Sequence, residues 1–261
     1  MDTIYHRAGS GLLKQSWFYS AWLEFLIRYR RTALGPAWML VGPGLFIVLL
    51  GGLYADIGGH GGEKFVPHLA TGLVCWTLIN GCTLGSTTVF QRSRAQILQG
   101  NVGLFDIVMI DVFSTILTFA HQLIILVFVF AFYRIPLTLY SLVSLVGFVL
   151  VVVNGIWLSA VFGIIGARYR DLAEVVQAVM RIAFLATPIL WMADKDSRVG
   201  SLAIYVLLNP FFHFLELIRA PLLGVAIAPA SWAVVLAITL AGFAVARFTM
   251  ARYARYVALW I

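Results

Sequence analysis

The sequence predicts an all-α integral membrane protein with six transmembrane helices, and three observations carry this prediction. Hydrophobic residues make up 62% of the 261-residue chain and charged residues only 11%, whereas a soluble domain carries roughly 25% charged residues. Six apolar segments approach or exceed the length of about 20 residues that crosses a bilayer. The basic residues also collect on one side of these segments, as the positive-inside rule expects.

The six segments follow one another along the chain at 37–57, 66–89, 107–132, 139–166, 174–192 and 230–247. An even number of spans places both termini on one side of the membrane. With the termini in the cytoplasm, that side holds thirteen of the 18 lysines and arginines. This sorting favours cytoplasmic termini. It also explains the net charge of +7 without a nucleic-acid partner.

Residues 1–36 are expected to form a cytoplasmic N-terminal region, 37–247 the transmembrane domain and 248–261 a cytoplasmic tail. No cleavable signal peptide is expected before the first span. Apolar residues recur at helical spacing within 14–31, so we expect an amphipathic helix lying in the membrane interface. Such a helix is either a simple anchor or a docking element for a soluble partner.

Two short apolar arms between the fifth and sixth spans predict a re-entrant hairpin over about 202–223, on the outer side of the membrane. The helix-breaking pair Asn209-Pro210 joins the arms. Glu216 and Arg219 lie three residues apart on the second arm, where they can face one another. Their pairing fits either a structural ion pair or a charged group at a pore mouth.

The sequence lacks the motifs of nucleotide-binding, metal-binding and nucleophilic catalytic sites. It contains no phosphate-binding loop, no metal-ligand spacing and no nucleophile motif, so we expect no catalytic residue, metal or bound cofactor. Cys75 and Cys82 lie seven residues apart on one predicted helix and are expected to be buried free thiols. His121 is expected to form an interhelical hydrogen bond, and Asp111 to serve as a cap or to snorkel. Because the sequence has no phosphate-binding loop for ATP, any transport needs energy from a partner.

Four motifs in register resemble the permease subunits of polysaccharide-export ABC transporters, the group that serves O-antigen, capsule and teichoic-acid export. These motifs are Tyr29-Arg-Arg-Thr-Ala-Leu-Gly-Pro-Ala-Trp38, Gly100-Asn101, Ala167-Arg-Tyr-Arg-Asp-Leu172, and Asn209-Pro210 with Glu216 and Arg219 before Pro221-Leu-Leu-Gly224. The resemblance covers nearly the whole chain. It implies a half-transporter of the bacterial inner membrane, in which two copies line one channel and contact membrane lipids. Two ATP-binding cassette subunits would bind ATP and Mg²⁺, and the cargo would be an undecaprenyl-linked polysaccharide.

The resemblance also implies roles for particular residues. The loop 91–103 and the loop after the fourth span would couple the chain to the ATPase, through Gln91, Arg92, Arg94, Gln99, Asn101, Arg168, Arg170 and Asp171. At the cytoplasmic gate, the pyrophosphate of the lipid carrier would meet Arg28, Arg30 and Arg31, since arginine binds phosphate through two hydrogen bonds. Residues at the channel or the outer hairpin would be Trp38, Tyr54, Trp191, Glu216 and Arg219. Topology alone also accounts for the arginines, and an interfacial belt for the aromatic residues.

Three other functions are open from the sequence. The first is an ABC permease for a drug or small lipid. The second is an intramembrane glycan or lipid transferase, for which only His121 and Asp111 are available as catalytic groups. The third is an assembly or scaffold protein, which would not need cytoplasmic coupling loops.

Overall fold

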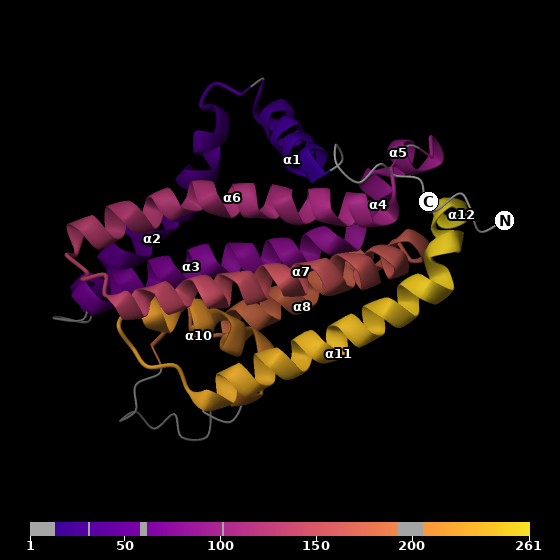
Figure 1. Cartoon of the computed structure of the whole chain (residues 1–261). Helices are drawn as coiled ribbons and strands as arrows, with labels where there is room; N and C mark the ends of the chain where they lie inside the picture. The colour runs from indigo at the N-terminus through magenta and orange to yellow at the C-terminus, as the bar shows by residue number, and fades with distance from the viewer. Residues whose placement is uncertain (1–13, 31, 58–61, 101, 193–205) are drawn as a thin grey trace.

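The computed structural model describes residues 14–30, 32–57, 62–100, 102–192 and 206–261, and every regular element among them is a helix. The first half forms α1 (Lys14–Tyr29), η1 (Gly35–Ala37), α2 (Trp38–Ile57), α3 (Gly62–Leu84), η3 (Gly85–Thr88), α4 (Val89–Arg92) and α5 (Arg94–Leu98). The second half forms α6 (Leu104–Phe132), η4 (Leu139–Leu142), α7 (Val143–Arg168), α8 (Leu172–Ala186), α10 (Pro210–Leu222), α11 (Pro229–Tyr253), η5 (Ala254–Tyr256) and α12 (Val257–Trp260). The long helices run side by side, and α4, α5 and α12 gather at one end of the bundle, here called the α4–α5 end (Figure 1).

Five helical segments of the described part of the chain are long and apolar enough to cross a membrane, which makes the chain a multi-pass membrane protein. They are Gly35–Tyr54, Glu63–Arg92, Leu104–Phe132, Leu139–Arg168 and Pro229–Trp260. These segments correspond to five of the six predicted spans. The second is longer than expected, because α3 continues through η3 into α4.

The remaining predicted span, 174–192, contains a helix too short to cross a bilayer by itself. The 15 residues of α8 extend about 22 Å, against about 30 Å of hydrocarbon. The helix stops because Pro188 disfavours the helical conformation of the residue before it, and Thr187 is extended with ψ 135°. Beyond the undescribed residues, the amide of Ile227 donates to Tyr140 Oη (3.1 Å), near the start of α7. The start of α8 and Ile227 therefore lie toward opposite ends of the bundle, and a sixth membrane crossing stays a prediction.

The predicted outer hairpin is described mainly by its second arm, which forms α10. Asn209 caps this helix, since its side-chain oxygen accepts from the amide of Phe211 (3.0 Å) and Pro210 occupies the first helical position. Most of the first arm lies outside the described residues. The re-entrant path accordingly stays a prediction.

Helix α1 packs across α6 on the outside of the bundle (Figure 1). Ala21 and Phe25 are buried there, and the indole nitrogen of Trp17 donates to Asp106 Oδ1 (2.8 Å), near the start of α6. Other apolar side chains of α1 stay exposed, including Leu26 and Ile27. This exposure suits a lipid-contacting helix, but its place in the membrane interface stays a prediction.

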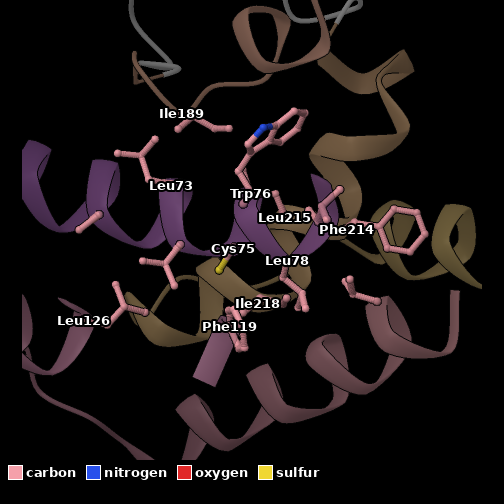
Figure 2. Packing of buried hydrophobic residues seen from close by; sticks show 14 of the residues in the cluster. Leu73, Cys75, Trp76, Leu78, Phe119, Leu126, Ile189, Phe214, Leu215 and Ile218 are labelled. Carbon is pink, nitrogen blue, oxygen red and sulfur yellow. The ribbon is translucent and has the colours of Figure 1, made fainter. Parts of the chain in front are cut away.

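The hydrophobic core is centred on α3. In the most apolar stretch of Glu63–Arg92, which includes α3, 61% is buried inside the protein. In the corresponding stretch of Gly35–Tyr54, which includes α2, only 11% is buried. Figure 2 shows Leu73, Trp76 and Leu78 of α3 packed among residues of α6 and α10. Cys75 and Cys82 are free and buried, as predicted.

Two glycines let α7 approach its neighbours at backbone distance. A Cβ atom on Gly166 would lie 1.9 Å from the carbonyl oxygen of Thr87 in η3, and one on Gly147 would lie 2.5 Å from that of Leu217 in α10. Backbone atoms cannot move aside as a side chain can. Both contacts therefore require glycine.

We expect Gly166→Ala to destabilise the protein by about 1–3 kcal/mol, as forced overpacking does. Gly52→Ala is the matched control, because a Cβ there meets no atom within 4 Å and alanine is the better helix former. Thermal unfolding in detergent, followed by size-exclusion fluorescence, measures both. Equal melting temperatures for the two variants would contradict this packing.

Candidate functional site: a polar groove beside α3

One face of α3 and η3 is polar although the helices around it are apolar. Thr77, Asn80, Gly81, Gly85 and Thr88 recur at three- and four-residue spacing, which places them on one helical face. Two cavities of about 350 and 200 Å³ open along this face, and both are lined by Gly81 and Gly85. The two cavities adjoin and are called here the polar groove.

The walls of the polar groove come from different parts of the chain. On one side α8 contributes Ala173, Glu174 and Gln177. The opposite wall consists of Asp111, Ser114, Thr115, Thr118 and Phe119 of α6, with Arg28 of α1 and Arg92 of α4. Segments distant in sequence thus surround one polar strip of α3.

Three threonine hydroxyl groups of the groove are compatible with a membrane helix because each has a backbone partner. Thr115 Oγ1 donates to the carbonyl of Asp111 (3.1 Å), Thr118 Oγ1 to that of Ser114 (3.0 Å), and Thr77 Oγ1 to that of Val74 (2.7 Å). This bonding uses the hydroxyl proton and leaves oxygen lone pairs for another donor. The groove therefore presents oxygen acceptors and the amide groups of Asn80 and Gln177.

An ion pair closes the groove at the α4–α5 end. Arg92 Nη2 donates to Asp111 Oδ1 (2.7 Å) and to the carbonyl of Gly85 (2.9 Å), while Ser159 Oγ of α7 donates to Asp111 Oδ2 (3.1 Å). Glu24 of α1 lies close enough to Arg92 and Arg28 to be influenced by their charges. The pKa of its carboxyl group is raised, because burial raises it more than the two arginines lower it.

The described residues predicted to couple the chain to an ATPase collect at the α4–α5 end. Arg94, Gln99, Arg170 and Asp171 are exposed there. Asn101 lies outside the described residues.

Other side chains of the predicted coupling set are engaged within the chain. Gln91 Nε2 donates to the carbonyl of Gly166 (2.5 Å), and the Arg168 guanidinium lies over the ring of Trp260 at 5.0 Å. Gln91 and Arg92 thus fasten α4 to α7 and α6.

The three arginines predicted at the gate are placed differently. Arg28 lines the groove, Arg30 is exposed without lining it, and Arg31 lies outside the described residues. The guanidinium of Arg28 therefore stands at the edge of the polar strip.

The predicted channel aromatics lie away from the groove. Trp38 is exposed at the start of α2, Tyr54 stacks on Phe65 with ring centroids 4.1 Å apart, and Trp191 Nε1 donates to the carbonyl of Leu185 (3.3 Å). None of the three lines either described cavity.

Glu216 and Arg219 form the ion pair that their spacing predicts, with Nη2 and Oε2 3.1 Å apart. Arg219 Nη1 also donates to the carbonyl of Pro188 (2.5 Å) and lies 3.2 Å from His68 Nε2. Arg219 is only 5% exposed. The pair thus ties α10 to α3 and to the turn after α8.

The two groups available to a transferase do not form one site. His121 Nδ1 bonds the carbonyl of Leu117 in its own helix (2.9 Å), and its ring packs on Phe25 with centroids 4.6 Å apart. The expected interhelical hydrogen bond is therefore wrong, and an aromatic contact replaces it. Asp111 lies ten residues earlier on α6, about 15 Å along the helix.

Arg28 and Arg92 were among the predicted site residues, but other polar residues of the groove were not. The missed residues include Thr77, Asn80, Ser114, Thr115, Thr118, Glu174 and Gln177. A signal existed in the sequence, because polar residues recur at three- and four-residue spacing within apolar spans. Only the packing of α8 and α6 against α3 shows that they share a groove.

Comparison with protein families gives one result, a match of residues 15–223 to the family described as ABC-2 type transporter. No curated protein matches the chain. The matched region includes α3, the groove, α4 and α5. The chain therefore belongs to the ABC-2 type transporter family, as a membrane permease that partners ATP-binding cassette subunits.

Proposed function

We propose that this permease moves a lipid-linked polysaccharide of the O-antigen or capsule type across the bacterial inner membrane. Two copies face each other in the proposed exporter, and two ATP-binding cassette subunits bind ATP and Mg²⁺ beneath them. The polar groove is the observation that carries this proposal. A membrane domain gains nothing from exposed hydroxyl and amide groups unless a polar cargo or water meets them.

The chemistry of the groove suits a sugar chain. Sugar hydroxyls both donate and accept hydrogen bonds, and the groove offers threonine and serine oxygens beside the amides of Asn80 and Gln177. Each such bond is weak in net terms, about 0.5–1.5 kcal/mol. A long repetitive chain can therefore slide along the groove without being trapped.

A second copy is part of the proposal because the groove is open on one side. Its floor is α3 and its walls are α6 and α8, so a facing copy would turn two grooves into one channel. Arg28 stands at the edge of the groove, where its guanidinium suits the carrier pyrophosphate. The exposed residues of the α4–α5 end supply the surface for the ATPase.

A small apolar cargo is the second candidate, and one observation favours it. A cavity of about 330 Å³ lies on another face of α3, with Ile79, Val151, Phe214 and Ile238 in its lining. Such a cavity fits a drug or lipid tail better than a sugar. The two candidates place the cargo on different sides of α3, so substitutions can separate them.

The tagged chain, purified from native membranes in mild detergent, is expected to bring with it a soluble subunit that contains a phosphate-binding loop. The complex should hydrolyse ATP in a vanadate-sensitive manner. Mass spectrometry and phosphate release measure both properties. A chain that repeatedly purifies alone and without ATPase activity would argue for a scaffold protein or a transferase.

Asn80→Leu and Gln177→Leu are expected to reduce surface polysaccharide at least tenfold, because each replaces a polar groove group by an apolar one. Thr249→Val is the control, since its hydroxyl lies outside the groove on α11 and is satisfied by the carbonyl of Val245 (2.9 Å). Unchanged export in the groove variants would remove the glycan path. Loss of drug or lipid transport on Val151→Trp, with export intact in the groove variants, would favour the second candidate.

Arg28→Gln is expected to lower export more than Arg30→Gln, because only Arg28 lines the groove. Export is measured as surface polymer per cell, with equal amounts of permease in the membrane as the control. Equal losses in the two variants would show that position in the groove does not matter for this charge.

A further inference from the structure

Arg92 occupies an unexpected position for a residue at a predicted ATPase-binding loop. Its guanidinium turns into the membrane domain and meets Asp111, whose side chain is only 10% exposed, at 2.7 Å. The Arg92 side chain is itself 50% exposed, and Arg94, two residues later, is exposed as well. Arg92 thus differs from an ordinary surface arginine in having an acidic partner within the membrane domain.

The Asp111 carboxylate joins three helices. One oxygen accepts from Arg92 of α4, the other accepts from Ser159 of α7 (3.1 Å), and the residue itself belongs to α6. Arg92 also donates to the carbonyl of Gly85, so it holds the bend at η3 as well. A carboxylate buried in an apolar bundle is strongly disfavoured without its partner, which makes this connection stiff.

The same two residues line the polar groove beside Thr115 and Thr118. A displacement of α4 would therefore pull on the α6 wall at the groove itself. We propose that Arg92 and Asp111 are positioning residues that transmit movement of α4 and α5 into α6 and α7, and that Arg92 is not an ATPase contact. This inference rests on the proposed function, because the movement would come from an ATPase at the α4–α5 end.

The test compares Arg92→Gln, Asp111→Asn, the double variant, Arg92→Lys and Arg94→Gln in the full complex. Surface export is divided by the vanadate-sensitive ATPase rate of the purified complex. Arg92→Gln and Asp111→Asn should each assemble normally but lose export per ATP roughly tenfold. The double variant should lose no more than either single variant, because the two residues act through one interaction. Arg92→Lys keeps the charge and should retain export within about threefold. Arg94→Gln should instead weaken ATPase association and leave the ratio unchanged.

A spin-label measurement tests the connection without any partner. Labels at Gln96→Cys on α5 and Val127→Cys on α6 report the distance between the loop and the span, and the native Cys75 and Cys82 are buried. Arg92→Gln should broaden this distance distribution, and Arg92→Lys should largely restore it.

Three results would overturn the inference: multiplicative losses in the double variant, ATPase dissociation on Arg92→Gln, or an unchanged distance distribution. A wild-type chain that purifies without an ATPase subunit would contradict the proposed function rather than this inference alone. The spin labels would still decide whether Arg92 holds α5 to α6.

Discussion

A polar group inside an apolar bundle must find its hydrogen-bond partners within the bundle, and this constraint organises both ends of the molecule. At the α4–α5 end, Asp111 is held by Arg92 and Ser159. At the opposite end, Arg219 is held by Glu216 and the carbonyl of Pro188. Among the residues that the structure describes, no buried side-chain nitrogen or oxygen lacks a partner. Each cluster holds together helices that are far apart in the sequence.

Between these two clusters the groove has fewer bonds between helices. Thr115 and Thr118 bond to the preceding turn of their own helix, whereas Thr77 of α3 also hydrogen-bonds Gln122 of α6. The α6 wall is therefore held to the α3 floor at Thr77 as well as at the Arg92 cluster. This arrangement suits a permease in which the α4–α5 end receives movement and passes it to the wall of a polar path. The close contact of Gly166 with Thr87 keeps α7 with η3 during such a movement.

Much of the fold follows from the sequence because apolar length is a direct consequence of bilayer thickness. Four of the five long segments were predicted within about three residues of the observed limits, with α3 running on into α4, whereas the last segment runs on to Trp260. Within 174–192 the helix ends before Pro188, a stop that the count of apolar residues did not include, and the sixth crossing stays a prediction. The functional groups were harder to predict. Arg92 and Asp111 were recognised separately, but no local pattern relates residue 92 to 111 or 159, and no spacing rule brings Gln177 beside Asn80. Those relations arise from helix packing.

The arrangement of two copies is the most direct test, because the polar groove is half of a channel only if a second copy covers it. We would determine the structure of the complex purified from native membranes in lipid nanodiscs by electron cryomicroscopy. The account predicts two permease copies with the α3 and α8 faces opposed across a polar path, and ATPase subunits against α4 and α5. Copies that meet through other faces and leave Asn80 and Gln177 against lipid would contradict it.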